Sequence, residues 1–227
     1  MRNKTGSKNH SLSGKSRGKD SPPVPRFPLG LIGGMSWESS AEYYRIINRL
    51  VRDTLGNPHS CPCILYSVDF AEFAELQHRG KWKALAEKTA DIARRLEAAG
   101  AGMLLLCTNT MHRVADEVEA GVSIPLLHIA DTAAESLVRG GIERVGLLGT
   151  RFTMGEDFYR DRMKAAGLEV IIPNVSDRES VHRTIYDELI AGVISQESRK
   201  RLVGVIRRLG KQEIGRASCR ERVCHRV

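Results

Sequence analysis

The chain alternates short apolar runs with amphipathic stretches from Leu29 onward. Each run is almost continuously apolar over five or six residues, which is typical of parallel strands that are covered on both faces. The runs predict six strands, at residues 29–34, 63–68, 102–107, 124–129, 144–149 and 168–172.

The stretches between these strands have the spacing of helices. In residues 81–99, small or apolar side chains recur three and four positions apart, and Gly100 then ends the predicted helix. The face that we expect to be buried consists of Leu85, Thr89, Ile92, Ala93 and Leu96.

Two residue pairs have the spacing of capping boxes, Thr153 with Glu156 and Ser176 with Glu179. They predict helices over 156–166 and 178–191. Because helices follow strands so regularly, the sequence predicts an α/β fold with parallel sheets and right-handed crossovers.

Both ends of the chain depart from this pattern. Residues 1–28 are rich in Ser, Gly, Lys and Pro, so we expect them to be disordered. No apolar run follows the last predicted helix, 197–209, so we expect no strand there and regard the residues from about 212 as foreign to the fold. The predicted organisation is a disordered basic tail over 1–28, a first α/β domain over 29–127, a truncated second α/β domain over 128–211, and a non-native or unstructured tail over 212–227.

The net charge of +8 comes from these two ends. Residues 1–28 hold seven Lys or Arg and one Asp, and residues 210–227 hold five Lys or Arg and two Glu, which leaves the body close to neutral. The body therefore lacks the basic surface of a nucleic-acid-binding protein. Nucleic-acid binding through the tails is an alternative that deletion of residues 1–28 would test.

Composition argues against several other classes of protein. No run approaches the roughly 18–20 apolar residues of a membrane span, and no apolar stretch follows the basic N-terminus as it would in a secretory signal. Cys61-Pro62-Cys63 has no second pair with zinc-site spacing, so we expect no metal. A cytoplasmic location without a membrane partner is the default expectation.

Ligands of open parallel sheets bind beyond the carboxyl ends of the strands, so the residues just after each strand are the candidates for chemistry. After the first strand, Gly33 and Gly34 permit a tight turn, and Ser36 can cap the next helix, whose free N–H groups favour an anion. The spacing matches neither a dinucleotide fingerprint nor a P-loop. Ser67 follows the second strand.

The third strand is followed by the most unusual segment, Cys107-Thr108-Asn109-Thr110-Met111-His112. A thiol at a strand end and helix start can ionise more readily, because the helix dipole favours the thiolate. A buried cysteine followed by ordinary helix-capping residues explains the same segment equally well. After the fifth strand, Thr150, Arg151 and Thr153 suit a carboxylate ligand, although capping alone accounts for Thr153.

These motifs together resemble the Asp/Glu/hydantoin racemase family, also called the aspartate/glutamate racemases. The matching segments are LGLIGGMSWESSAEYY, YSVDF, LLLCTNTMH, LLHIADTAAES and VGLLGTRFTMGEDFYRDR, in the same order, from about Leu29 to Leu209. The resemblance implies two similar three-layer α/β domains with the active site between them. It implies cofactor-independent interconversion of L- and D-aspartate or glutamate, with dimers common in families of this kind, so a homodimer is one option.

The implied mechanism places a base and an acid, typically two cysteines, on opposite faces of the substrate Cα, while donors hold its carboxylate. Thr108 and Cys107 are the catalytic candidates. The candidate substrate-binding residues are Met35, Ser36, Trp37, Ser67, Asn109, Thr110, His112, Thr150, Arg151 and Thr153.

Two departures from the family pattern matter. The usual Cys-Asn-Thr is Thr108-Asn109-Thr110 here, with Cys107 one place early, and neighbouring strand residues face opposite sides. The second cysteine motif, Gly-Cys-Thr-Glu after a further strand, is absent, since Cys219 stands in Ala-Ser-Cys-Arg. We therefore expect impaired racemase activity. A binding module for acidic amino acids, and a decarboxylase or isomerase of the same superfamily, are the alternatives.

Overall fold

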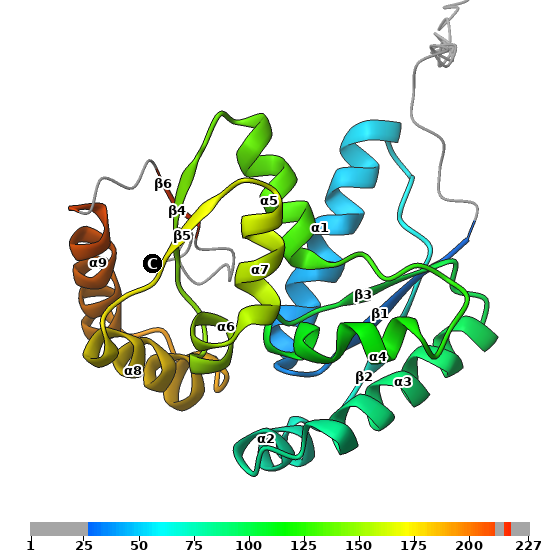
Figure 1. Ribbon diagram of the computed structural model, residues 1–227. Helices are drawn as coiled ribbons and strands as arrows, with labels where there is room; N and C mark the ends of the chain where they lie inside the picture. Colours follow the sequence, from blue (N-terminus) through cyan, green and yellow to red (C-terminus); the bar gives the residue numbers. More distant parts are fainter. Residues whose placement is uncertain (1–26, 212–215, 219–227) are drawn as a thin grey trace, which may run out of the picture.

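The computed structural model describes residues 27–211 and 216–218 of the chain. Within them lie two three-stranded, fully parallel sheets with the orders β2-β1-β3 and β5-β4-β6 (Figure 1). We call the parts built on these sheets the first lobe and the second lobe. The strands are β1 (Leu29–Gly33), β2 (Cys63–Ser67), β3 (Met103–Leu106), β4 (Arg144–Leu147), β5 (Glu169–Ile171) and β6 (Arg216–Ser218). The predicted α/β fold with parallel sheets is confirmed.

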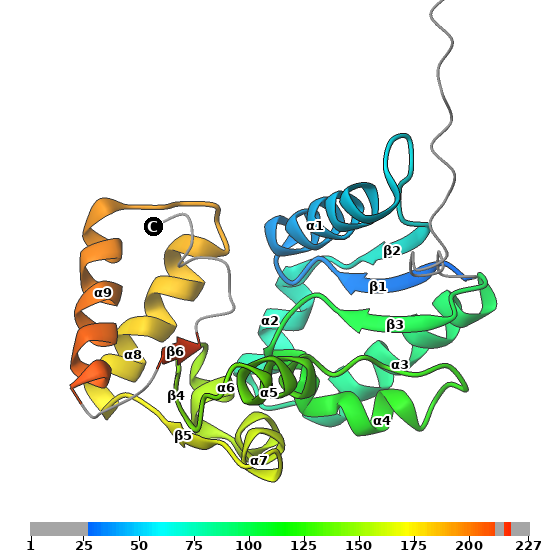
Figure 2. The same ribbon diagram turned by 90° about the horizontal axis from the view of Figure 1, so that it is seen from above.

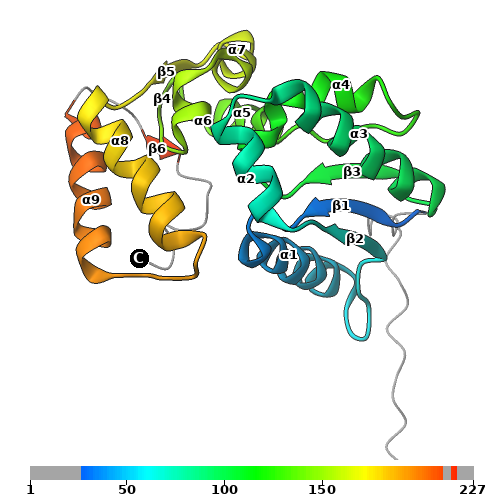
Figure 3. The same ribbon diagram turned by 90° about the horizontal axis from the view of Figure 1, so that it is seen from below.

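Helices cover both faces of each sheet. In the first lobe, α1 lies on one face, and α3 and α4 lie on the other (Figure 3). In the second lobe, α5 and α7 pack on one face of β4, and α8 and α9 lie on the other (Figure 2). The first-lobe helices are α1 (Trp37–Leu55), α2 (Phe70–His78), α3 (Trp82–Ala98), the 3-10 helix η1 (Thr110–Val114) and α4 (Ala115–Glu119). The second-lobe helices are α5 (Ile129–Arg139), α6 (Arg151–Gly155), α7 (Asp157–Ala165), α8 (Val175–Arg183), the π-helix η2 (Thr184–Leu189) and α9 (Gln196–Gly210).

The predicted buried face of α3 is confirmed, because all five of its residues are less than a tenth exposed. The four apolar ones pack with Ile32 of β1 and Leu104 of β3 in the core of the first lobe. Leu202, Val205 and Leu209 of α9 are buried in the same way against Met154 in the second lobe. Burial of these apolar side chains stabilises each lobe by roughly 1.5–3 kcal/mol per large residue.

Five of the six predicted strands are present, but residues 124–129 are not a strand. This segment forms a single parallel bridge, Leu104 with Leu126, flanked by hydrogen bonds from Leu104 N to Pro125 O and from Leu127 N to Leu104 O. The ladder stops there because the next residue, His128, caps α5 by accepting a hydrogen bond from Ala130 N.

The two predicted capping boxes are wrong. Thr150 caps α6 by accepting a hydrogen bond from Thr153 N, and α7 then begins after Glu156 without a side-chain cap. Asn174 caps α8 through Asp177 N, so that Ser176 and Glu179 lie inside the helix. Each cap comes earlier because a polar side chain directly after a strand meets the first free N–H groups.

The expectation that no strand follows α9 is also wrong. Residues 216–218 form β6, which pairs with β4 through Val145 with Arg216 and Leu147 with Ser218. Strand pairing uses main-chain N–H and C=O groups, so a short edge strand forms without the apolar run that hydropathy detects. The rest of the predicted tail, 212–215 and 219–227, and residues 1–26 of the basic tail lie outside the described residues. The division into domains at 127/128 stays a prediction.

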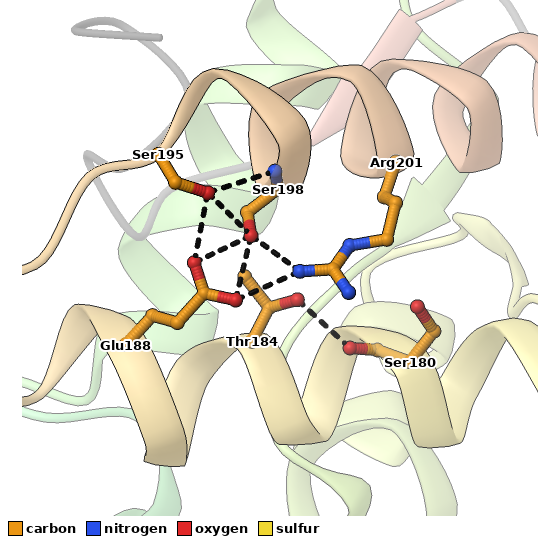
Figure 4. A network of polar contacts seen from close by, with 6 residues as sticks. All are labelled: Ser180, Thr184, Glu188, Ser195, Ser198 and Arg201. Atoms are coloured by element: carbon orange, nitrogen blue, oxygen red, sulfur yellow. Dashed lines mark hydrogen bonds and ion pairs between the residues drawn. The ribbon is translucent and has the colours of Figure 1, made fainter.

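A polar network fixes the connection between η2 and α9 (Figure 4). The carboxylate of Glu188 accepts hydrogen bonds from Ser195 Oγ at 3.1 Å, Ser198 Oγ at 2.6 Å and Arg201 Nη2 at 2.8 Å. Ser195 also caps α9 by accepting from Ser198 N. Among the described residues no helix is both long enough and apolar enough to span a bilayer.

Candidate functional site

The carboxyl ends of β3 and β4 meet where the two lobes face each other. Thr110 Oγ, just after β3, lies 2.9 Å from Thr150 Oγ, just after β4. Thr150 Oγ lies 3.2 Å from Thr153 Oγ, and all three side chains are buried. Three residues predicted for substrate binding therefore form one hydroxyl cluster, which joins the lobes at their strand ends.

The turn after β1 is shaped by its glycines. Gly34 has φ +92°, and a Cβ there would lie 2.3 Å from Val68 O, so no other residue fits without displacing β2. Gly34 N donates to Ser40 Oγ at 2.9 Å, which in turn donates to Ser36 O. Ser36 occupies the N-cap position of α1 but makes no side-chain capping bond, so its predicted capping bond is not formed, and Ser40 instead ties the turn to the helix.

The candidates around this turn differ in accessibility. Met35 is buried, Ser36 is half-buried, and Trp37 is 66% exposed. Ser67 is exposed, and its hydroxyl lies close to Gly34, since a Cβ on that glycine would be 3.0 Å from Ser67 Oγ. Met35, Ser36 and Ser67 thus share one edge of the first sheet, whereas Trp37 faces outward.

Cys107 lies in the core rather than at the surface of the site. Its side chain is 1% exposed, and burial, with a smaller contribution from Cys63, raises the pKa of the thiol to about 12. The thiol is therefore protonated at neutral pH, which opposes the interpretation of Cys107 as a thiolate. Thr108, the next residue, is half-buried.

His112 holds the main chain of Thr108. Its Nδ1 lies 2.8 Å from Thr108 O, and its Nε2 accepts a hydrogen bond from Ile129 N at 3.2 Å. Nδ1 must carry the proton, because Nε2 is an acceptor. Both ring nitrogens make hydrogen bonds and the ring is 2% exposed, so His112 positions Thr108. It is therefore not available to bind a ligand, although the sequence had placed it among the substrate-binding candidates.

The His112 ring also packs against His128, with 4.5 Å between ring centroids. Burial, then the neighbouring charge of His128, lowers the pKa of His112 to about 3. Burial and Arg162 lower the pKa of His128 to about 4. Both rings are neutral at pH 7. His128 is itself buried and caps α5, and Asp131 pairs with Arg162.

Two further residues at the lobe boundary were missed by sequence reasoning. His182 Nδ1 accepts a hydrogen bond from Arg151 N at 3.4 Å, and its buried ring contacts Phe152 and Tyr186. Tyr186 donates its hydroxyl hydrogen to Gln77 Oε1 at 2.8 Å and so ties η2 to α2 of the first lobe. The sequence offered one signal for this pair: His182 and Tyr186 are four residues apart, which places both side chains on one helical face.

Arg151 and Asn109 complete the predicted set. The Arg151 side chain is exposed, with its guanidinium 5.1 Å from the centre of the Phe152 ring, while Asn109 is 8% exposed. Within residues 27–211 and 216–218, no three His, Cys, Asp or Glu side chains gather as a metal-binding group. The site is therefore built from hydroxyls, main-chain N–H groups and one guanidinium, which suit a carboxylate ligand.

Comparison with known proteins gives this site its context. A crystal structure of a candidate Asp/Glu racemase from Yersinia pestis superimposes with a TM-score of 0.77 at 49% identity, and covers 85% of each chain. An aspartate racemase homologue from Pyrococcus horikoshii OT3 gives a TM-score of 0.71 at 31% identity, over 87% of each chain.

A more distant relative is the broad specificity amino-acid racemase RacX of Bacillus subtilis (strain 168), which is 26% identical over 153 residues. That match covers 63% of each chain, so this chain spans less than two thirds of RacX. The sequence model of the Asp/Glu/Hydantoin racemase family matches residues 32–217, which include both sheets almost entirely. A match of that extent, with the same fold in relatives of known structure, shows that the chain belongs to the Asp/Glu/Hydantoin racemase family.

Proposed function

We propose that this chain binds an acidic amino acid, aspartate or glutamate, between its lobes and acts on the Cα–H bond as a cofactor-independent racemase. The observation that carries the proposal is the contact between Thr110 and Thr150, which brings the carboxyl ends of two like sheets together beside the half-buried Thr108. The names of the relatives, an amino-acid racemase and an aspartate racemase homologue, support the same reaction.

In the proposed reaction a side chain on one face of Cα removes the proton, and a group on the other face returns one. Thr108 is the proposed group on the first-lobe side, held by the His112 ring through its carbonyl oxygen. Hydroxyls and N–H groups at the strand ends would stabilise the negative charge that develops on the carboxylate. A hydroxyl is a far weaker base than a thiolate, so proton transfer on the two faces would be unequal.

We further propose that the 227-residue chain turns over slowly. The printed sequence contains no Gly-Cys-Thr-Glu, and the cysteine after β6, Cys219, is followed by Arg220. A binding module for acidic amino acids is the second candidate, and the protonated, buried thiol of Cys107 favours it.

Exchange of the Cα proton in heavy water, followed by NMR on L-aspartate and L-glutamate, tests these proposals. The racemase proposal predicts slow exchange that is lost in Thr108→Ala, with little D-enantiomer formed. Stabilisation of the chain against heat by the amino acid, without exchange in wild type, would identify the binding module instead. Rapid formation of the D-enantiomer would contradict the proposed impairment.

We propose that the chain forms a homodimer. In α1, Ser40 is the one buried residue, while Trp37 and Tyr44, seven residues apart on one side of the helix, are more than half exposed. Two exposed aromatic side chains on one helix face suit an isologous contact with a second copy of the chain. Sedimentation velocity tests it: wild type is expected as a dimer and Tyr44→Lys as a monomer.

A further inference from the structure

Glu38 carries a buried oxygen that the fold leaves without a partner. It is the second residue of α1, directly beyond the carboxyl end of β1. Its Oε2 is inaccessible to solvent and has no hydrogen-bond partner among the described residues. A carboxylate oxygen removed from water without a donor is unfavourable by several kcal/mol, so a cation or donor is expected beside it.

The same carboxylate reaches the opposite lobe. The first turn of α1 is the end of that helix nearest the second lobe (Figure 3). A Cβ placed on Gly192, in the connection between η2 and α9, would lie 3.1 Å from Glu38 Oε1. Gly192 has φ +72° and brings no side chain, so it leaves room beside the carboxylate. The Glu188 network in Figure 4 holds this connection in place.

Other carboxylates around the lobe boundary are already engaged. Glu156 is paired with Arg113, and Asp131 is paired with Arg162. Asp69, after β2, caps α2 by accepting from Ala71 N. Glu38 therefore differs from them in having an oxygen with no donor within the part of the chain that the structure describes.

The candidate site, as described above, needs an anionic group. Its hydroxyls, N–H groups and Arg151 suit carboxylates, but an amino acid also carries an α-ammonium group that needs an anionic acceptor. We propose that the carboxylate of Glu38 binds the α-ammonium of the amino-acid ligand, at the boundary between the lobes. This inference rests on the proposed function and adds a binding residue to it.

The test compares amino acids with the same diacids lacking the ammonium group. Calorimetric titration of the full chain uses L-aspartate against succinate, and L-glutamate against glutarate. In wild type the amino acid binds more tightly than the diacid. Glu38→Gln is expected to weaken the amino acid about tenfold to a hundredfold, the range of a charge-assisted hydrogen bond, and to leave the diacid unchanged or tighter.

Asp53→Asn is the matched control, because Asp53 is an exposed carboxylate on the same helix and the substitution removes the same charge. It is expected to leave the preference for the amino acid intact. Glu38→Asp keeps the charge but shortens the side chain, and is expected to fall between wild type and Glu38→Gln. It provides the same comparison if Glu38→Gln does not fold.

Two outcomes overturn the inference, and they are distinguishable. If wild type binds the amino acid and Glu38→Gln keeps the same preference over the diacid, Glu38 does not bind the ammonium, while the proposed function stands. If wild type binds neither L-aspartate nor L-glutamate, the proposed function fails and the role of Glu38 fails with it.

Discussion

The imidazole of His112 donates from Nδ1 to the carbonyl oxygen of Thr108 over 2.8 Å, so a buried neutral ring fixes the position of the proposed proton-transfer residue. His112→Ala would leave Thr108 O and Ile129 N without partners and open a cavity. We expect a loss of about 3–5 kcal/mol in the free energy of unfolding, measured by urea denaturation. Glu135→Ala, an exposed change on α5, is expected to shift it by less than about 0.5 kcal/mol. A similarly small effect of His112→Ala would contradict the positioning role.

The histidine pair gives the fold a defined acid sensitivity. The pKa values of His112 and His128 are lowered to about 3 and about 4, while both return to about 6.5 on unfolding. The unfolded state therefore binds more protons, and the stability that is fully present well above pH 6.5 is lost as pH falls toward 4 for His128 and toward 3 for His112. We expect a loss of about 2 kcal/mol per histidine between pH 7 and pH 5, measured by denaturant titrations at several pH values.

His128→Asn separates the two contributions. Asparagine is a good N-cap, so the cap of α5 is kept while one titrating group is removed. The loss of stability between pH 7 and pH 5 is expected to shrink by about 2 kcal/mol, the contribution of His128. An unchanged dependence would show that other groups dominate it.

Cys107 is expected to be chemically inert in the folded protein. Its thiol is 1% exposed, and its pKa of about 12 leaves almost no thiolate at pH 8. Peptide mapping after iodoacetamide treatment at pH 8 should find Cys107 unmodified without denaturant and modified in 6 M guanidinium chloride. Fast labelling of Cys107 in the folded chain would restore the thiolate interpretation.

The hydroxyl of Tyr186 joins the lobes through Gln77 Oε1 at 2.8 Å. Tyr186→Phe removes this bond and is expected to lower the free energy of unfolding by about 1 kcal/mol. Glu135→Ala, the exposed change on α5 introduced above, is the control and is expected to shift the free energy of unfolding by less than about 0.5 kcal/mol. Equal stabilities for the two variants would mean that the Tyr186–Gln77 contact does not contribute in solution.

The sequence was sufficient for most of the scaffold because periodicity reports burial. The continuous apolar runs that became β1, β3 and β4 are largely buried, and the spaced face of α3 meets Ile32 and Leu104 in the core. Thr110 and Thr150 were both candidate substrate-binding residues, but they follow strands of two different sheets, and only the resemblance to the family suggested a site between two domains.

What the sequence could not predict depended on partners distant along the chain. Whether His112 faces a ligand or the backbone was decided by Thr108 O and Ile129 N, which no local pattern identifies. The strand β6 forms by main-chain pairing with β4, which a hydropathy pattern does not detect. The choice of Thr150 and Asn174 as caps was set by where the preceding strands end, within a few residues of the predicted positions.

Replacing the hydroxyl of Thr108 by a thiol tests the proposed chemistry most directly. A cysteine thiol with an ordinary pKa near 8.5 is a few per cent ionised at pH 7, whereas a threonine hydroxyl is not. If Thr108 takes the Cα proton, Thr108→Cys should raise the rate of Cα-proton exchange of L-aspartate or L-glutamate in heavy water at least about tenfold. The gain should increase with pH up to the pKa of the new thiol. Cys107→Ala, which removes the neighbouring buried thiol, should leave exchange unchanged. Exchange that is indifferent to Thr108→Cys but lost in Cys107→Ala would move the proton-transfer role from one residue to the other, despite the burial of Cys107.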